Sequence, residues 1–129
     1  ILDKLTELKL AENTIVVYFH DNGPNSFRWN GGMKGKKGSV DEGGVRSPLF
    51  VRWPAQIKPG TTIGGIAGPI DLLPTLAALT KTPLISKKTL DGIDLSPMLR
   101  DTAASMPERT IYSYHGGRIS ARTATHRLD

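Results

Sequence analysis

Asp21 and Asn22 are the first side chains in the sequence that could carry chemistry, because they lie at the end of the apolar segment 14–19, just after His20. In open α/β sheets, sites gather at the carboxyl ends of the strands. A carboxylate beside a carboxamide also offers the oxygen donors that a hard cation such as calcium takes. Asp-Asn-Gly-Pro is equally an ordinary turn sequence. Local sequence alone therefore leaves a metal-ligand pair and a structural turn both open.

Lys37 is the second candidate, and it lies in a glycine-rich loop between Gly35 and Gly38. A lysine ammonium that reaches a pocket built by bare backbone suits a sulfate or phosphate oxygen. The segment does not match a nucleotide-binding P-loop, because glycine rather than serine or threonine follows the lysine. The alternative is a solvated surface lysine.

The histidines and the missing cysteines limit the remaining chemistry. His20, His115 and His126 are the only histidines, and their spacing is not that of a histidine metal cluster. His20 adjoins Asp21, and we expect it to contact substrate, whereas the position of His115 in a turn indicates a structural or exposed residue. With no cysteine in the chain, disulfides, zinc-thiolate sites and thiol nucleophiles are excluded. No Gly-x-Ser-x-Gly nucleophile elbow occurs either.

These residues must be positioned by alternating helices and strands. The periodicity predicts a helix over 1–10 and another over 71–79, with Asp71 as the N-cap of the second. Apolar, β-branched runs predict strands at 14–19 and 48–54, the first buried on both faces of a parallel sheet. Last, two alternating runs separated by Gly116 and Gly117 predict an antiparallel hairpin. We therefore expect an α/β portion over 1–107 and a small antiparallel subdomain over 108–129.

Composition excludes several classes of protein. The chain has 129 residues and a net charge of +5, but its basic residues are scattered rather than interleaved with aromatic ones, so we do not expect a nucleic-acid partner. No apolar run approaches the ~18–20 residues of a membrane span, and we expect no membrane partner.

Several motifs, taken in order, resemble those of the sulfatase family, and together they cover essentially the whole chain. They are Asn13–Gly23, Trp29–Ser39, Glu42–Pro48, Val51–Pro54, Ile70–Leu76 and Leu90–Leu95, followed by strands of a C-terminal subdomain over Arg118–Leu128. The resemblance implies an alkaline-phosphatase-like fold, in which helices sandwich a sheet, and the hydrolysis of sulfate esters. It further implies that Asp21 and Asn22 are calcium ligands and that Lys37 is a catalytic residue that contacts the sulfate group. A sulfated small molecule or glycan is the implied substrate, and the implied location of the whole protein is periplasmic or secreted.

The chain also departs from the family pattern. The family's formylglycine motif, Cys/Ser-x-Pro-Ser-x-Arg, and its first acidic ligand pair are absent, and His20 stands where serine is usual. We therefore expect a C-terminal portion of a longer enzyme that is inactive alone and binds calcium very weakly. We also expect the missing N-terminal half or a second chain to complete the sheet. An inactive sulfatase-like binding module and a phosphate or phosphonate ester hydrolase of the same superfamily remain the alternatives.

Overall fold

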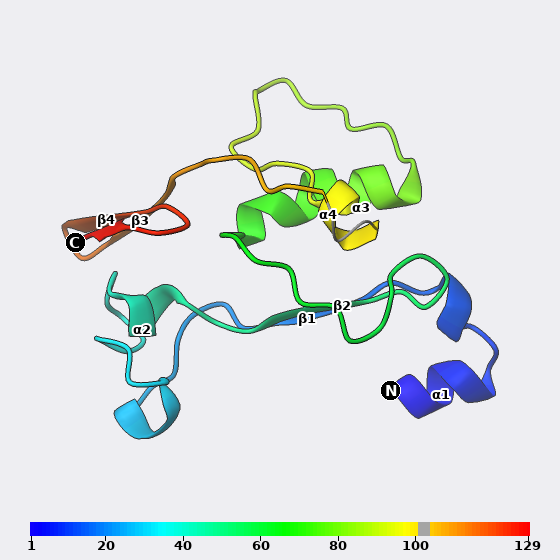
Figure 1. Ribbon diagram of the computed structural model, residues 1–129, viewed down its shortest axis with the longest axis horizontal. Coiled ribbons are helices and arrows are strands. Elements are labelled where there is room, and N and C mark those ends of the chain that lie inside the picture. The colour runs from blue at the N-terminus through cyan, green and yellow to red at the C-terminus, as the bar shows by residue number, and fades with distance from the viewer. Residues whose placement is uncertain (101–103) are drawn as a thin grey trace.

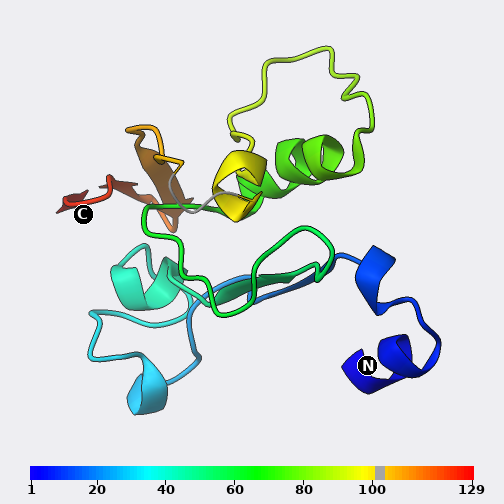
Figure 2. The ribbon, with the colours of Figure 1, turned by 45° about the vertical axis from the view of Figure 1, so that its right-hand side comes forward.

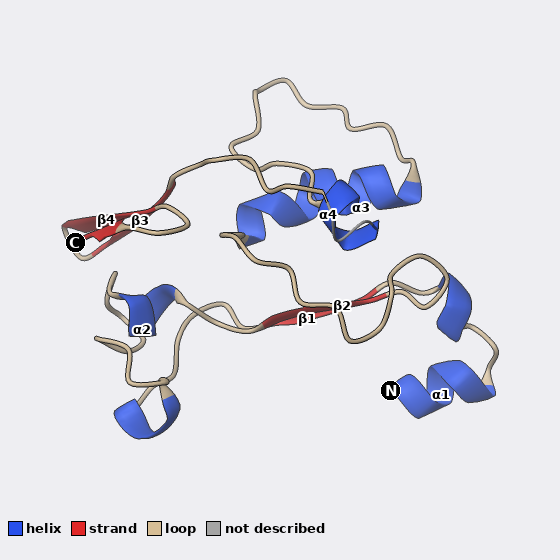
Figure 3. Cartoon of the chain, viewed as in Figure 1, coloured by secondary structure: helices blue, strands red, loops and turns tan. Residues whose placement is uncertain are grey.

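A computed structural model of the protein describes residues 1–100 and 104–129. Figure 1 shows short helices and strands joined by long connections, and Figure 3 shows how much of the chain those connections occupy. The elements are α1 (Leu2–Glu7), β1 (Val16–Phe19), α2 (Glu42–Val45), β2 (Leu49–Arg52), α3 (Leu72–Thr80), α4 (Ser96–Arg100), β3 (Ile111–His115), β4 (Arg118–Arg122) and β5 (Arg127–Leu128). Three short 3-10 helices are added at Ala11–Asn13, Phe27–Trp29 and Pro69–Asp71.

The predicted strands near the N-terminus exist, but their pairing and burial differ from expectation. β1 and β2 form an antiparallel pair in which Val17 lies opposite Val51, so the expectation of parallel strands is wrong for these two. Tyr18 and Phe19 are 54% and 41% exposed, so β1 is not buried on both faces. An apolar strand is covered only where further layers pack on it, and within the described residues no other strand pairs with β1 or β2.

A small apolar core lies between α3 and α4. Leu79 of α3 is buried together with Leu95 and Met98, which lie before and within α4. The helix forms where predicted, because its leucines and alanines favour helix and Pro74 falls in the first turn, where a missing N–H is tolerated. Figures 1 and 2 place both helices on the same side of the β1–β2 pair.

Asp71 is the N-cap residue of α3, as predicted, but its carboxylate makes no cap hydrogen bond to that helix. Instead, it is fully buried and accepts hydrogen bonds from the backbone N–H groups of Gly68 (2.8 Å) and Ile93 (2.9 Å). Arg109 Nη1 lies 2.7 Å from the same carboxylate. The reason for the difference is tertiary: a buried carboxylate is stabilised more by a buried guanidinium and two N–H groups than by one cap bond.

The predicted C-terminal hairpin is confirmed. β3, β4 and β5 form an antiparallel sheet in that order, and His115 pairs with Arg118 as the last residue of β3 rather than as a turn residue. Gly116 and Gly117 have φ angles of +56° and +78°, a conformation that favours glycine and suits a tight hairpin turn. Figures 1 and 2 both show this sheet next to α2. The division of the chain at residue 108 stays a prediction.

The chain buries few apolar side chains. Among the residues that the structure describes, the buried apolar ones are Ala11, Val40, Leu79, Leu95 and Met98. Phe50 of β2 is 64% exposed, next to the exposed aromatic side chains of β1. Across the described ranges, no helix has both the length and the apolar character that crossing a membrane requires.

Candidate active site

The structure brings Asp21, Asn22 and Lys37 to one cavity of about 360 Å³. Its other lining residues come from the loop 30–41 that carries Lys37, here named the lysine loop, from α2, from the segment before α3 and from β3. They are Gly38, Ser39, Gly44, Val45, Pro69, Ser113 and His115. Residues up to 94 positions apart in the sequence therefore meet at this cavity, since Asp21 and His115 both line it. A volume of this order is within the range of small-molecule sites.

Two backbone hydrogen bonds join the segment after β1 to α2 and to the lysine loop. The N–H of Gly23 donates to the carbonyl oxygen of Gly44 at 2.8 Å, and the N–H of Lys37 donates to the carbonyl oxygen of Pro24 at 2.9 Å. The approach at Gly23 is so close that a Cβ atom there would lie 1.8 Å from the Gly43 carbonyl oxygen. Only glycine fits at this point. The glycines that look like turn residues in the sequence are therefore what allows Lys37 to approach Asp21.

The orientation of Asn22 suits a metal ligand. Its amide nitrogen donates to the Gly23 carbonyl oxygen at 2.8 Å, which leaves the amide oxygen available on the other side. Asp21 adds an exposed carboxylate that lines the same cavity. Carboxylate and amide oxygens fit calcium, but the ion takes about six to eight oxygens, so this pair alone is an incomplete set. Within residues 1–100 and 104–129, no group of three His, Cys, Asp or Glu side chains gathers to hold a metal.

Lys37 differs from its neighbouring lysines in what it contacts. Lys34 forms an ion pair with Asp41 at 3.0 Å, and the ammonium of Lys36 lies 5.4 Å from the centre of the Phe27 ring. By contrast, none of the ion pairs among the described residues involves Lys37, which is one of the residues that line the cavity. The ammonium of Lys37 is thus available to an anion in the cavity.

Hydrogen bonds, several of them between charged groups, hold the lysine loop and α2 against the C-terminal sheet. Glu42 accepts hydrogen bonds from Arg122 and Arg127, both at 2.8 Å. The Ser120 hydroxyl donates to the Val40 carbonyl oxygen at 3.1 Å, and Arg127 donates to the same oxygen. Lys34, which donates a hydrogen bond to Asp41, holds the pKa of that carboxyl below its usual value, against the opposing effect of burial. These contacts fix the loop that carries Lys37 against β4 and β5.

His20 is placed differently from the other predicted site residues. Its ring nitrogen Nε2 lies 2.7 Å from the Tyr18 hydroxyl, and it is not among the residues that line the cavity. Its carbonyl oxygen accepts a hydrogen bond from Ser47 at 2.8 Å, which ties the end of β1 to the start of β2. The role of His20 in substrate binding stays a prediction that this geometry does not favour.

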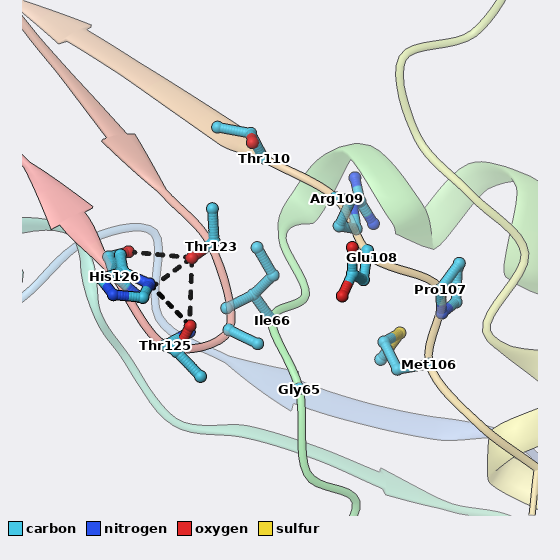
Figure 4. Close-up of a pocket in the computed structure, with 11 residues that line it drawn as sticks. Gly65, Ile66, Met106, Pro107, Glu108, Arg109, Thr110, Thr123, Thr125 and His126 are labelled. Atoms are coloured by element: carbon cyan, nitrogen blue, oxygen red, sulfur yellow. Dashed lines mark hydrogen bonds between the residues drawn. The ribbon is translucent and has the colours of Figure 1, made fainter.

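A second, larger cavity of about 490 Å³ lies between residues 106–110 and the turn 123–126, as Figure 4 shows. It contains none of the predicted site residues. Its polar groups are largely engaged with one another: Thr125 Oγ1 lies 2.8 Å from His126 Nδ1, and the His126 N–H donates to Thr123 Oγ1 at 2.9 Å. Arg109 is paired with Asp71. The smaller cavity is therefore the candidate active site, because of these two cavities it is the one that combines a cationic group and oxygen donors without ion-pair partners among the described residues.

Comparison with known proteins gives the family. The family model described as Sulfatase matches residues 1–82. Arylsulfatase A of Homo sapiens is 44% identical over 119 residues, which is 88% of this chain and 23% of that protein. Steryl-sulfatase of Mus musculus is 34% identical over an alignment of 131 residues, which is 94% of this chain and 21% of that protein. The chain belongs to the sulfatase family.

The comparison with solved structures gives the fold of this sulfatase chain. The solved structure of BT4656 in complex with its substrate, D-glucosamine-2-N,6-O-disulfate, is similar with a TM-score of 0.70 at 23% identity. That match covers 98% of this chain and 27% of BT4656. It shows the fold, which is part of an alkaline-phosphatase-like α/β fold. The chain spans about a quarter of the length of the sulfatases it matches.

Sequence reasoning did not assign Ser113 and His115 to the site. Both line the cavity with Lys37. His115 is exposed, as predicted, but it is the last residue of β3 and not a turn residue. The sequence feature that could have indicated their place in the site is the two-residue period of a strand, which places the side chains of residues 113 and 115 on one face of β3. What the sequence could not tell was that this face meets the end of β1.

Proposed function

We propose that the chain is the C-terminal portion of a sulfuric ester hydrolase, to which it contributes half of a calcium site and a sulfate-binding lysine. The observation that carries the proposal is that Asp21, Asn22 and Lys37 line one cavity. The formylglycine nucleophile, made from a cysteine or serine, and the remaining ligands would come from a part of the polypeptide outside this sequence.

Each of the three residues has a role that follows from its chemistry. Asp21 supplies a carboxylate oxygen and Asn22 an amide oxygen to the calcium site. A calcium ion bound there supplies Lewis-acid polarisation of the sulfate oxygens. Lys37 binds the sulfate group and offsets the negative charge on its oxygens while the ester S–O bond breaks and the electron pair of that bond goes to the leaving oxygen. A fixed cation in a site of this kind stabilises the transition state more than an ammonium in water would.

The rest of the polypeptide is the partner that the β1–β2 pair requires. Tyr18, Phe19 and Phe50 expose aromatic surface on a two-stranded ladder with open edges. Exposed apolar surface and unpaired strand edges favour association with other chains. We propose that the remaining strands and helices of the enzyme cover this surface. We expect the isolated chain to self-associate, and light scattering that shows a stable monomer would contradict this.

The activity is tested on the complete polypeptide that carries this chain, purified with calcium, using a matched pair of a 4-nitrophenyl sulfate and a 4-nitrophenyl phosphate. We expect kcat/KM to be higher for the sulfate ester. Replacing Lys37 (Lys37→Ala) should lower kcat/KM by about 10²–10³-fold, the usual effect of removing one charge-stabilising group. The control is Lys36→Ala, since Lys36 lies over Phe27 and does not line the cavity. Its effect should stay within about fivefold, as for an exposed charge.

Other outcomes separate the alternatives. Faster hydrolysis of the phosphate ester would favour a phosphate ester hydrolase of the same superfamily. No hydrolysis of either ester would favour an inactive binding module. Equal losses in Lys37→Ala and Lys36→Ala would remove the specific role of Lys37.

The isolated chain provides a second test of the half-site. With only two side-chain oxygens for an ion that takes about six to eight, it should bind calcium very weakly and hydrolyse neither ester. Isothermal titration calorimetry that gives micromolar affinity would contradict the assignment of a half-site. In the complete polypeptide, Asp21→Ala and Asn22→Ala should both weaken calcium affinity.

A further inference from the structure

Strand β3 contributes two polar side chains to the wall of the candidate active site. Ser113 and His115 both line the cavity that contains Asp21, Asn22 and Lys37. Residues two apart on a strand point to the same face. Tyr112 and Tyr114 alternate with them and are 67% and 75% exposed. The strand therefore presents a hydroxyl and an imidazole to the cavity and its tyrosines elsewhere.

The imidazole of His115 differs from those of the other two histidines. His20 lies 2.7 Å from the Tyr18 hydroxyl, and His126 lies 2.8 Å from the Thr125 hydroxyl. No hydrogen bond joins the side chain of His115 or Ser113 to any other residue within 1–100 and 104–129, although both face the cavity. Their hydrogen-bonding capacity is therefore available to a ligand.

The position of these two side chains relative to Lys37 is fixed by the contacts of the neighbouring strands. β3 pairs with β4 along its whole length, with Ser113 opposite Ser120. Ser120 in turn donates to the Val40 carbonyl oxygen at 3.1 Å, three residues from Lys37 along the loop. Glu42 is held by Arg122 of β4 at 2.8 Å. A site whose groups are held this way can orient a substrate.

A sulfate ester has two parts, a charged sulfate group and a neutral organic group, and the cavity has groups suited to each. The ammonium of Lys37 and the oxygens of Asp21 and Asn22 suit the sulfate group and its cation. A serine hydroxyl and a neutral imidazole both donate and accept hydrogen bonds, which suits the hydroxyl groups of a sugar. Val45 and Pro69 line the same cavity and add apolar surface for the carbon face of a ring.

We propose that Ser113 and His115 form the subsite for the organic group of the ester, and that they select a hydroxyl-rich, saccharide-like group over an aryl group. This inference rests on the proposed function, because it takes the bound anion to be a sulfate ester. A site built to hydrogen-bond a hydroxyl discriminates against analogues that lack it, because its polar groups are then left unpaired.

The test measures kcat/KM of the complete polypeptide on two kinds of probe. One is 4-nitrophenyl sulfate, and the other is a set of monosaccharide sulfates, namely the 6-sulfates of glucose, galactose, N-acetylglucosamine and N-acetylgalactosamine. We expect at least one sugar sulfate to be hydrolysed. His115→Ala and Ser113→Ala should each lower the ratio of kcat/KM for the sugar sulfate to that for the aryl sulfate by about five- to tenfold, as the loss of one hydrogen bond implies.

Two further variants serve as controls. His115→Gln keeps a hydrogen-bonding side chain and should restore part of the ratio. Tyr114→Ala removes a neighbouring side chain that is exposed and does not line the cavity, and should leave the ratio unchanged. Ser113→Ala changes the volume of the side chain little, so it remains a test if His115→Ala fails to fold.

The outcomes are distinct. An unchanged ratio in both His115→Ala and Ser113→Ala would overturn the subsite, as would a wild-type enzyme that hydrolyses the aryl sulfate but none of the sugar sulfates. A wild-type polypeptide that hydrolyses no sulfate ester would overturn the proposed function itself, and with it this inference.

Discussion

The backbone N–H of Lys37 donates a hydrogen bond of 2.9 Å to the carbonyl oxygen of Pro24, two residues after Asn22. This bond joins the loop that carries the candidate anion-binding lysine to the turn that carries the candidate calcium ligands. A second bond, from Gly23 to Gly44 at 2.8 Å, joins the same turn to α2. The distance between cation and oxygen donors is therefore set by backbone contacts, which depend on glycines rather than on the site residues themselves.

Replacing Gly23 with alanine should displace the lysine loop. A Cβ atom at position 23 would lie 1.8 Å from the Gly43 carbonyl oxygen, so backbone must move. Overpacking of this kind typically costs about 1–3 kcal/mol. In the complete polypeptide we expect faster amide hydrogen exchange over residues 34–45 and a loss of kcat/KM. Gly64→Ala is the matched control, since a Cβ there meets nothing within 4 Å, and it should change neither. Unchanged exchange in Gly23→Ala would contradict the close contact.

Glu42 should hold the C-terminal sheet against the lysine loop. Its carboxylate accepts hydrogen bonds from Arg122 and Arg127 at 2.8 Å each and is largely buried. Hydrogen bonds to charged groups contribute about 1.5–3 kcal/mol each, so Glu42→Gln should lower the free energy of local opening by a similar amount. Amide exchange over residues 111–128 measures this. Glu7→Gln is the control, because its pair with Lys4 is exposed at 63% and 64%, and it should leave that exchange unchanged.

Local sequence patterns predicted the elements that depend on near neighbours. The hairpin at Gly116 and Gly117, the helix at 72–80 and the turn at Asp21 all arise from residues that lie close together in the chain. The patterns could not predict contacts that depend on distant residues. Asp71 is the N-cap residue of α3, as predicted, but its carboxylate pairs with Arg109, which lies 38 positions further along the chain. His115 lies next to two glycines, so the local sequence predicts a turn residue. No residue near it in the sequence indicates that it lines the same cavity as Lys37.

The exposed side chains of β1 show a different limit. An apolar run such as 14–19 predicts a strand that something covers, but not whether the covering layer belongs to the same stretch of sequence. Tyr18 and Phe19 are exposed, and the chain spans about a quarter of the length of its relatives. Under the proposed function, the remaining strands and helices of the enzyme would cover these side chains. The antiparallel direction of the pairing between β1 and β2 could not be predicted from local patterns either, since Val17 and Val51 lie 34 positions apart in the sequence.

Asp41 should make the lysine loop sensitive to acid. The hydrogen bond from Lys34, chiefly, holds the pKa of Asp41 below its usual value. A carboxyl group whose pKa is lowered by folding contributes stability above its unfolded pKa and loses it as the pH falls through the lower, folded value. The difference in thermal midpoint between wild type and Asp41→Asn should therefore be largest near neutral pH and shrink as the pH falls below about 4. Added salt should reduce the difference, because Lys34 is 71% exposed.

The control for that measurement is Asp3→Asn, since Asp3 is exposed on α1 and far along the chain from the lysine loop. Its difference from wild type should not follow the same dependence on pH. If the Asp41→Asn difference grew on acidification instead, the assigned direction of the Asp41 pKa shift would be wrong.

The Asp71–Arg109 pair should contribute more to stability than any other ion pair among the described residues. Asp71 is fully buried and the Arg109 side chain is 11% exposed, so removing one partner leaves a buried charge without compensation. Such a loss typically costs about 3–5 kcal/mol. Asp71 also accepts hydrogen bonds from Gly68 and Ile93, so Asp71→Asn should loosen the segments on both sides of α3. Thermal unfolding of the complete polypeptide measures the effect, with the exposed Asp91→Asn as a control that should change little.

A double-mutant cycle separates the ion pair from the other contacts of Asp71. Arg109→Met removes the guanidinium but keeps an apolar side chain of similar reach, and it should also be strongly destabilising. Because the two residues are in direct contact, the double variant Asp71→Asn/Arg109→Met should lose less stability than the sum of the single losses, by about 0.5–3 kcal/mol. Additive losses would mean that Asp71 acts through the N–H groups of Gly68 and Ile93 alone. In that case, the connection between α3 and the C-terminal sheet would have to come from apolar packing instead of from charge.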